Sequence, residues 1–397
     1  MKKLLSVISF ILIASLLCGL TAFAGQTDTP AYAAKLRFGE DGKFKILQIA
    51  DIQETAVLYP ITRDFITDIV STSQPDLIVL TGDNIAGGGS NTTIKPLDKM
   101  LVGISINNFM KILESFGIPV AAVFGNHDAE NSLTKEEQLV IYSKYDCFIG
   151  YDEGSAVSGA GNHNVPIYSS ADSSKMAYNL WMVDSGMYDK VNGGYDYVKQ
   201  DQIDWYVNTS NALKAANGGI MVPSMMFQHI IVPEIYDALK EVPEGTAGAI
   251  SRNGKYYVLN EANTISGEMH ESPCPSNTNS GQFDAVVNQG DVVAMFFGHD
   301  HVNTFQVNYR GVDIVTSPGI TFQSYGDASR GAREIILDES DLLRYTTNLI
   351  DYHDIYGDDT AANLRFTMYG NEFAVLDRVI AALKYVLLIA AGYMKSV

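Results

Sequence analysis

Residues 119–128 have the sequence PVAAVFGNHD, an apolar run that ends in glycine and three polar side chains. Two earlier stretches have the same form, FKILQIAD at 44–51 and DLIVLTGDN at 76–84. Short apolar runs bounded in this way predict buried strands, and the segments between them, 61–71 and 104–116, have the apolar spacing of amphipathic helices. This alternation predicts an α/β fold in which helices cover a sheet.

The second half of the chain repeats this pattern with fewer helices. Further strands are expected at 182–184, 221–229, 292–299 and 305–317. Ligands of open α/β sheets bind at the carboxyl ends of the strands. The sequence therefore predicts that polar residues following several strands meet at one edge.

The predicted strand ends carry carboxylate, amide and imidazole groups. In chain order they are Asp51, Gln53, Asp83, Asn84, Asn126, His127, Asp128, His229, His299, Asp300 and His301. Aspartate and imidazole together suit divalent cations such as Zn, Mn or Fe. A carboxylate can bridge two ions about 3.5–4 Å apart, so the set permits a two-metal site. Taken singly, Asp51 also fits a helix N-cap and Asp83 a turn, but the ordered set favours ligands.

These residues resemble the motifs of the calcineurin-like metallophosphoesterase superfamily, which are D-x-H, G-D, G-N-H-[DE], a lone H and G-H-x-H. The stretches GEMHE at 267–271, PCP at 273–275, NSG at 279–281 and GHDHVN at 298–303 also resemble the purple-acid-phosphatase-like subgroup. The resemblance runs from Asp51 to His301. It implies a four-layer αββα sandwich of two mixed β-sheets flanked by helices.

The resemblance implies roles for the matching residues. Asp83 corresponds to the carboxylate that bridges both metals. The remaining ligands are Asp51 and His301 for the first metal and Asn126, His229 and His299 for the second. His127 corresponds to the imidazole that contacts the phosphate and protonates the leaving alkoxide, and Asp128 is expected to orient it.

Gln53 departs from the superfamily pattern, because it stands where a histidine is usual. An amide oxygen can ligate a hard cation but is a poorer donor to Zn or Fe than imidazole. The first metal site is therefore expected to be weakened, or biased toward Mn, Mg or Ca. An alternative is that Gln53 only forms a hydrogen bond within its loop.

The expected activity is that of a metal-dependent phosphoric ester hydrolase. Two divalent ions (Mn, Fe or Zn) would activate a water that attacks a phosphate monoester, in a phosphorylated small molecule or a phosphoprotein. A phosphodiester or nucleotide substrate is an alternative, as is a degenerate metal-binding protein without catalysis. Glu268, His270 and Glu271 fit a substrate-side role and a solvated loop equally well.

The composition limits the partners of the chain. The 397 residues include 27 Lys and Arg against 46 Asp and Glu, so the formal net charge is −19. Nucleic-acid binding through bulk charge is therefore excluded, since it needs clustered basic residues. Two histidines outside the motifs, His163 and His353, are expected at the surface.

The first 24 residues are expected to be a secretory signal peptide. Lys2 and Lys3 precede an apolar run at 4–20, and an A-x-A cleavage pattern follows at 22–24. The mature protein would then be secreted, periplasmic or at the cell surface. An uncleaved anchor and a lipoprotein are weaker alternatives. Cys147 and Cys274 would remain, as one disulfide or as free thiols.

The phosphoesterase domain is expected to cover 36–350, and 351–397 to form a connector and a C-terminal amphipathic helix. The apolar stripe of this helix consists of Leu376, Ile380, Leu383, Leu387 and Ala390. Charged residues interrupt it, so it falls short of a spanning helix. A packed helix is expected, while membrane contact or an oligomer contact is an alternative.

Overall fold

Strand β1 (Lys43–Ile49) sends alternate side chains to two different cores. Ile46 belongs to the core between the two large sheets, whereas Leu47 and Ile49 belong to the core beneath the helices. This follows from the period of two residues along a strand. The computed structural model that shows this arrangement describes residues 36–87 and 94–395. The predicted signal peptide therefore lies outside the described residues.

The first large sheet is mixed. Its strands are β1, β2 (Leu77–Thr81), β3 (Val120–Val123), β14 (Gly331–Asp338) and β15 (Tyr345–Asp351). They lie in the order β15-β14-β1-β2-β3, with β1, β2 and β3 parallel and β14 antiparallel to β1. The three parallel strands thus end at the same edge.

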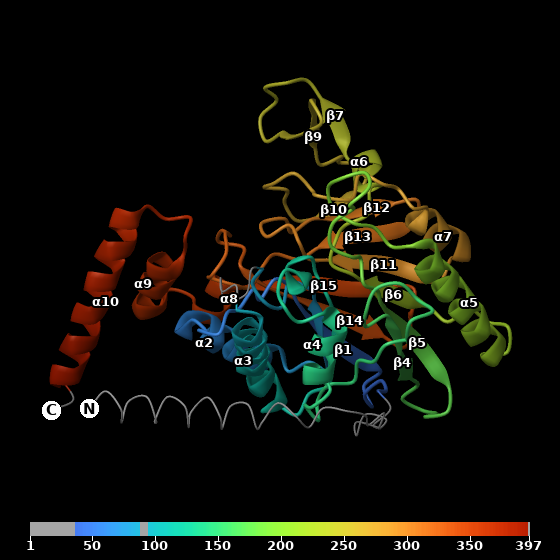
Figure 1. Ribbon diagram of the computed structural model, residues 1–397, viewed down its shortest axis with the longest axis horizontal. Coiled ribbons are helices and arrows are strands. Elements are labelled where there is room, and N and C mark those ends of the chain that lie inside the picture. Colours follow the sequence, from blue (N-terminus) through green and yellow to red (C-terminus); the bar gives the residue numbers. More distant parts are fainter. Residues whose placement is uncertain (1–35, 88–93, 396–397) are drawn as a thin grey trace. The chain divides into compact units, whose positions relative to one another are not determined.

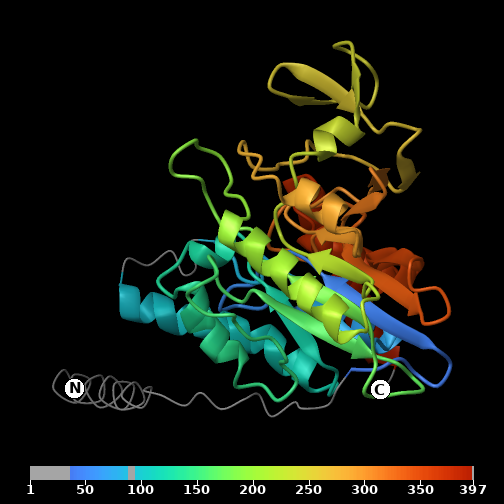
Figure 2. The ribbon, with the colours of Figure 1, turned by 90° about the vertical axis from the view of Figure 1, so that its right-hand side faces the viewer.

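The second large sheet is also mixed. Its strands are β4 (His163–Tyr168), β5 (Met176–Met182), β6 (Ser224–Phe227), β10 (Thr264–Ser266), β11 (Val292–Phe297), β12 (Gln306–Tyr309) and β13 (Val312–Thr316). They lie in the order β10-β12-β13-β11-β6-β5-β4, and β6 runs parallel to both β5 and β11. A separate small sheet contains β7 (Lys240–Val242), β8 (Ile250–Arg252) and β9 (Lys255–Val258). It projects from the end of the larger sheet (Figures 1 and 2).

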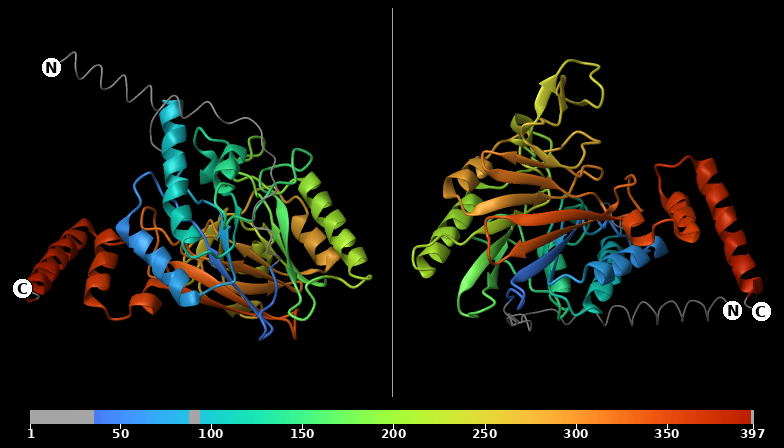
Figure 3. Two further views of the ribbon diagram at one scale, coloured as in Figure 1. Left: turned by 90° about the horizontal axis from the view of Figure 1, so that it is seen from below. Right: turned by 180° about the vertical axis from the view of Figure 1, so that it is seen from behind.

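Helices cover the outer face of each large sheet. On the first sheet these are α2 (Pro60–Ser73), α3 (Lys95–Glu114) and α4 (Lys135–Tyr142). On the second sheet they are α5 (Gln200–Ala216), α6 (Ile235–Ala238) and α7 (Gln282–Gln289). Figures 1 and 3 show α2 and α3 on one side of the stacked sheets and α5 and α7 on the other. The predicted four-layer αββα sandwich is confirmed.

The core between the sheets explains why these strands are so apolar. Phe44 and Val79 of the first sheet belong to the same buried cluster as Phe227, Phe296 and other residues of the second. The rings of Phe227 and Phe296 stack with centroids 5.2 Å apart. Because both faces of a central strand are buried, its sequence is a continuous apolar run.

Two sequence-based expectations are wrong. The stretch 305–317 forms a hairpin of β12 and β13 rather than one strand, because Arg310 and Gly311 take positive φ values of 53° and 86° at its turn. His163 is fully buried. The segment expected as a connector contains two short helices, α8 (Tyr352–Tyr356) and α9 (Thr360–Tyr369), whose first turns are capped by Asp351 and Asp359.

The chain continues from α9 into α10 (Val375–Lys395), which packs on α9. Among the described residues, no helix combines the length and apolar character needed to cross a bilayer. Cys147 is buried and Cys274 half-buried, and both are free thiols.

Candidate metal centre

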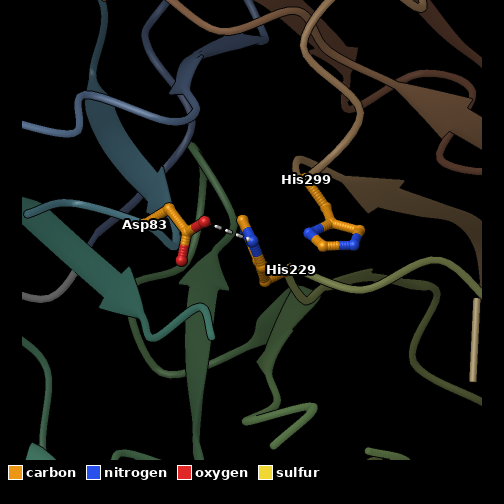
Figure 4. A group of neighbouring side chains, drawn as sticks. All are labelled: Asp83, His229 and His299. Atoms are coloured by element: carbon orange, nitrogen blue, oxygen red, sulfur yellow. Dashed lines mark ion pairs between the residues drawn. The ribbon is translucent and has the colours of Figure 1, made fainter. Parts of the chain in front are cut away.

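The carboxyl ends of five strands bring the predicted ligands to one edge. Asp51 and Gln53 follow β1, Asp83 follows β2, and Asn126 and His127 follow β3. From the second sheet, His229 follows β6, and His299 and His301 follow β11. Figure 4 shows Asp83, His229 and His299 converging from three of these strand ends.

Distances between donor atoms are short across the gap between the sheets. Oδ2 of Asp83 lies 3.1 Å from Nε2 of His229, and one donor atom each from Asp83, His229 and His299 lies within 4.8 Å of the others. Oδ1 of Asp51 lies 3.4 Å from Nε2 of His301 and 4.0 Å from Nε2 of His229. Two sequence segments more than 145 residues apart thus form one polar cluster.

Contacts behind the cluster fix the orientation of two imidazoles. Nδ1 of His229 lies 2.9 Å from the Thr81 carbonyl oxygen, and Nδ1 of His301 lies 2.9 Å from that of Tyr325. A carbonyl oxygen only accepts, so each Nδ1 carries the hydrogen. This leaves the Nε2 lone pair directed into the cluster, the tautomer that binds a metal.

The carboxylates are held in the same way. Oδ2 of Asp51 accepts the backbone N–H of His299 at 3.0 Å, and Oδ1 of Asp83 accepts that of His127 at 2.7 Å. One oxygen of each carboxylate is therefore used by the protein. The other oxygen faces the histidines.

Several buried donor atoms of the cluster form no hydrogen bond within the described part of the chain. They are Oδ1 of Asp51, Oδ1 of Asn126 and Nε2 of His299. Buried polar atoms are rarely left in this state, because each costs roughly 1–3 kcal/mol. A divalent cation is the group that satisfies a converging set of oxygen and imidazole donors, so the residues present fit such an ion.

The carboxylate and imidazole groups of the cluster shift one another's pKa values. Burial would raise the pKa of Asp83, but the positive charge of His229 and contact with it outweigh burial and hold that pKa well below its usual value. Burial lowers the pKa of His229, while Asp83 raises it, to a net value of about 9. Burial and the neighbouring His229 lower the pKa of His299. In the neutral form that binds a metal, Nε2 of His229 carries no proton, so metal binding would release the proton that this raised pKa favours.

Backbone strain is concentrated at these strand ends. Four of these residues have positive φ values, a region that residues other than glycine rarely adopt: Asp51 (51°), Gln53 (42°), Asp83 (49°) and His299 (75°). Such strain costs on the order of 1–3 kcal/mol per residue and clusters at functional sites. A Cβ on the neighbouring Gly125 would lie 2.1 Å from Oδ1 of Asp83, so the close approach of these loops requires glycine.

A family model described as calcineurin-like phosphoesterase matches residues 44–303. The chain belongs to this family. It is 29% identical over 341 residues to "Probable inactive purple acid phosphatase 29" of Arabidopsis thaliana, covering 78% of this chain and 80% of that protein. It is 26% identical over 306 residues to "Phosphatase DCR2" of Saccharomyces cerevisiae, covering 71% of this chain and 48% of that one.

Solved structures include similar proteins. A dimetal phosphatase from Danio rerio has a TM-score of 0.47 and 12% identity, covering 77% of this chain and 98% of that one. The purple acid phosphatase relatives agree with the subgroup that the sequence resembles.

In this calcineurin-like phosphoesterase, Gln53 points into the cluster. Its Nε2 lies 3.1 Å from Nε2 of His301 and 3.5 Å from Oδ2 of Asp83. Because Nδ1 of His301 carries the hydrogen, its Nε2 accepts the hydrogen bond from the amide. A half-turn of the amide exchanges its nitrogen and oxygen, so Oε1 can take the same place toward a cation.

The residue that contacts the imidazole of His127 is Glu130 and not the predicted Asp128. Nδ1 of His127 lies 2.6 Å from Oε2 of Glu130, and the Tyr188 hydroxyl donates to Oε1 of the same glutamate. The oxygens of Asp128 instead accept the backbone N–H groups of Gly125 and Ile85. Burial and the charge of Asp83 raise the pKa of Asp128 to about 7. The predicted orienting role of Asp128 is therefore corrected: Asp128 holds the loop, and Glu130 holds the imidazole.

Two tyrosines beside the cluster were missed by sequence reasoning as site residues. The Tyr195 ring meets His299 edge-on with centroids 4.2 Å apart, and the Tyr325 ring stacks on His301 at 4.2 Å. Both lie outside helices and strands, where no periodic pattern marks them. In the segment with Glu268 and His270, Nδ1 of His270 lies 2.9 Å from Oδ2 of Asp327, two residues from Tyr325, and its Nε2 lies 2.9 Å from Oε2 of Glu268.

Proposed function

We propose that this chain is a metal-dependent hydrolase of phosphate esters, with phosphate monoesters of a small molecule or a phosphoprotein as the preferred substrates. The observation that carries the proposal is the convergence of buried carboxylate, amide and imidazole donor atoms at the strand ends, several of which form no hydrogen bond among the described residues. The proposed ligands are Asp51, Gln53, Asp83, Asn126, His229, His299 and His301. Two bound divalent cations would polarise the phosphoryl oxygens and lower the pKa of a water from 15.7 toward about 7.

Asp83 and His127 have different proposed roles in the reaction. Asp83 presents the carboxylate expected between the two ions, since its Oδ2 lies 3.1 Å from Nε2 of His229 and 3.5 Å from Nε2 of Gln53, which belong to the two proposed ligand groups. His127 is the proposed acid: its Nε2 lies 3.9 Å from Oδ2 of Asp83, and its Nδ1 is occupied by Glu130. Nε2 is thus the nitrogen free to give a proton to the leaving alkoxide.

A second candidate function is metal binding without turnover. Two observations favour it: Gln53 replaces an imidazole and bonds to Nε2 of His301, and relatives of the chain carry names that include "inactive". The intact set of Asp83, Asn126, His127, His229 and His299 supports hydrolysis instead. We place the enzyme first for that reason.

Secretion or display at the cell surface belongs to the same proposal. Its support is the sequence of residues 1–24, with a basic start, an apolar run and an A-x-A pattern. Cleavage after Ala24 would be detected by N-terminal sequencing of the exported protein. An intact N-terminus on the protein in its final compartment would contradict it.

The decisive experiment is hydrolysis of a generic aryl phosphate monoester and diester by metal-free protein to which Mn, Zn or Mg is added. We expect activity that depends on metal and is higher on the monoester. Asp83→Asn is the matched control, because it keeps size and removes one charge. Metal binding without any turnover, in every metal tested, would favour the second candidate.

A further inference from the structure

Helix α10 has two apolar faces, and one of them is covered by α9. On the covered side Ala381 is buried and Tyr385 is half-buried. Nε of Arg378 donates to the Met368 carbonyl oxygen of α9 at 3.2 Å. Figure 1 shows α10 lying beside α9.

The opposite side of α10 is apolar and exposed. Large side chains there are between 40% and 69% exposed, which is unusual for leucine and isoleucine gathered on one helix face. The row along the centre of this face consists of Leu376, Ile380, Leu383, Leu387 and Ala390. At about 100° per residue the row points about 180° away from Ala381 and Tyr385.

The spacing of this row is that of a coiled-coil seam. Successive members are separated by 4, 3, 4 and 3 residues, the alternation of a and d positions in a heptad. Val379 and Val386, which are 50% and 63% exposed, widen the face at the g positions. A seam of this kind is buried in proteins by a second helix with the same repeat.

Two charged residues line the other border of the row. Asp377 and Lys384 are seven residues apart, so both take the e position. Both are exposed, and no ion pair involves either of them among the described residues. In an antiparallel pair e positions face e positions, which would place each Asp377 beside the Lys384 of the other copy. In a parallel pair the e positions face g positions, and the charges would meet valines.

We propose that α10 is a self-association surface, which pairs antiparallel with α10 of a second copy through the seam at 376, 380, 383, 387 and 390. The arrangement is isologous, so one kind of contact is made twice. A lipid surface fits less well. Interfacial helices carry a polar face rich in Lys and Arg, whereas the 21 residues of α10 include three basic residues, of which Arg378 is bound to α9. A chain of net charge −19 is also repelled by anionic headgroups.

The test is the mass of the full chain in solution over a concentration series, by sedimentation equilibrium. We expect a dimer. Asp377→Lys and Lys384→Asp each turn two attractions into two repulsions, so each should weaken the homodimer by roughly 10- to 30-fold. The two variants mixed together, and the double variant Asp377→Lys/Lys384→Asp, should dimerise again.

Further variants distinguish the other outcomes. Leu383→Glu places a charge in the seam on an exposed position and should give a monomer with an unchanged circular dichroism spectrum. A wild-type monomer at every concentration would overturn the proposal. So would a dimer that all these substitutions leave intact, or a monomer that binds phosphatidylcholine vesicles through α10.

Discussion

Nδ1 of His127 lies 2.6 Å from Oε2 of Glu130, three residues further along the short 3₁₀ turn that follows β3. This contact leaves Nε2 of His127 as the nitrogen facing the metal cluster. Tyr188 in turn holds the other oxygen of Glu130. The imidazole of His127 is thus held by Glu130, and Glu130 is held by Tyr188 from a different segment of the chain.

Replacement of Glu130 tests this arrangement. Glu130→Gln keeps the size of the side chain but removes the charge beside His127, so we expect a rate loss of roughly 10- to 100-fold, by analogy with residues that hydrogen-bond the imidazoles of metal sites. The loss should be larger for alkyl phosphates, which need a proton on the leaving group, than for nitrophenyl phosphate. An equal loss on both substrates would contradict the role, and metal content measured alongside should stay the same.

Replacement of His127 tests the acid itself. His127→Ala should keep its metal and lose rate by roughly 10²- to 10⁴-fold on alkyl phosphates. The measurement is metal content by mass spectrometry together with the rates on alkyl and nitrophenyl esters. If the variant loses metal instead, His127 is a ligand and the assignment of the acid is wrong.

Gln53 offers a gain-of-ligand experiment. Gln53→His would put imidazole where the amide now bonds to His301, so the affinity for Zn should rise and the preference of hydrolysis should shift away from Mn and Mg. Titration with each metal measures this. Gln53→Leu, which offers no donor, is the control and should weaken binding. Identical titrations for all three proteins would show that position 53 takes no part in binding metal.

Most of the central strands can be predicted from the sequence, because a strand that is buried on both faces has a continuous apolar sequence. Leu47, Ile46 and their neighbours predict β1 for that reason. The residues after each run then predict the cluster, since parallel strands end together. The position of Asp51 and His301 after predicted strands was enough to predict that they lie in the same cluster.

Other features depend on side-chain directions that a linear pattern does not contain. Asp128 and Glu130 lie on the same short turn, and only its geometry directs Glu130 to His127 and Asp128 to the backbone. Tyr195 and Tyr325 come from loops. His163 lies on β4, where neighbouring polar residues hide its burial.

His163 gives a pH dependence that is independent of the metal cluster. Burial lowers its pKa from 6.5 to about 4, against a smaller opposing effect of its contact with the Gly161 carbonyl. Between these two values the unfolded chain binds a proton that the folded chain does not. The free energy of unfolding should therefore fall as the pH drops from 6.5 to 4, by roughly 1.4 kcal/mol per pH unit from this group.

Urea unfolding of the wild type and of His163→Gln at pH 7.5 and pH 5 measures this effect. The variant should lose less stability between the two pH values, whatever its stability at pH 7.5. An equal loss in both proteins would mean that His163 is protonated in the folded state.

The central claim is that Asp83 joins two cations at the strand ends, and metal stoichiometry tests it most directly. Purified wild-type protein equilibrated with Mn or Zn should hold two ions per chain. Asp83→Ala removes the carboxylate that faces both groups of ligands, so it should hold fewer ions and lose hydrolysis by several orders of magnitude while remaining folded by circular dichroism. Two ions per chain and an undiminished rate in Asp83→Ala would contradict the account.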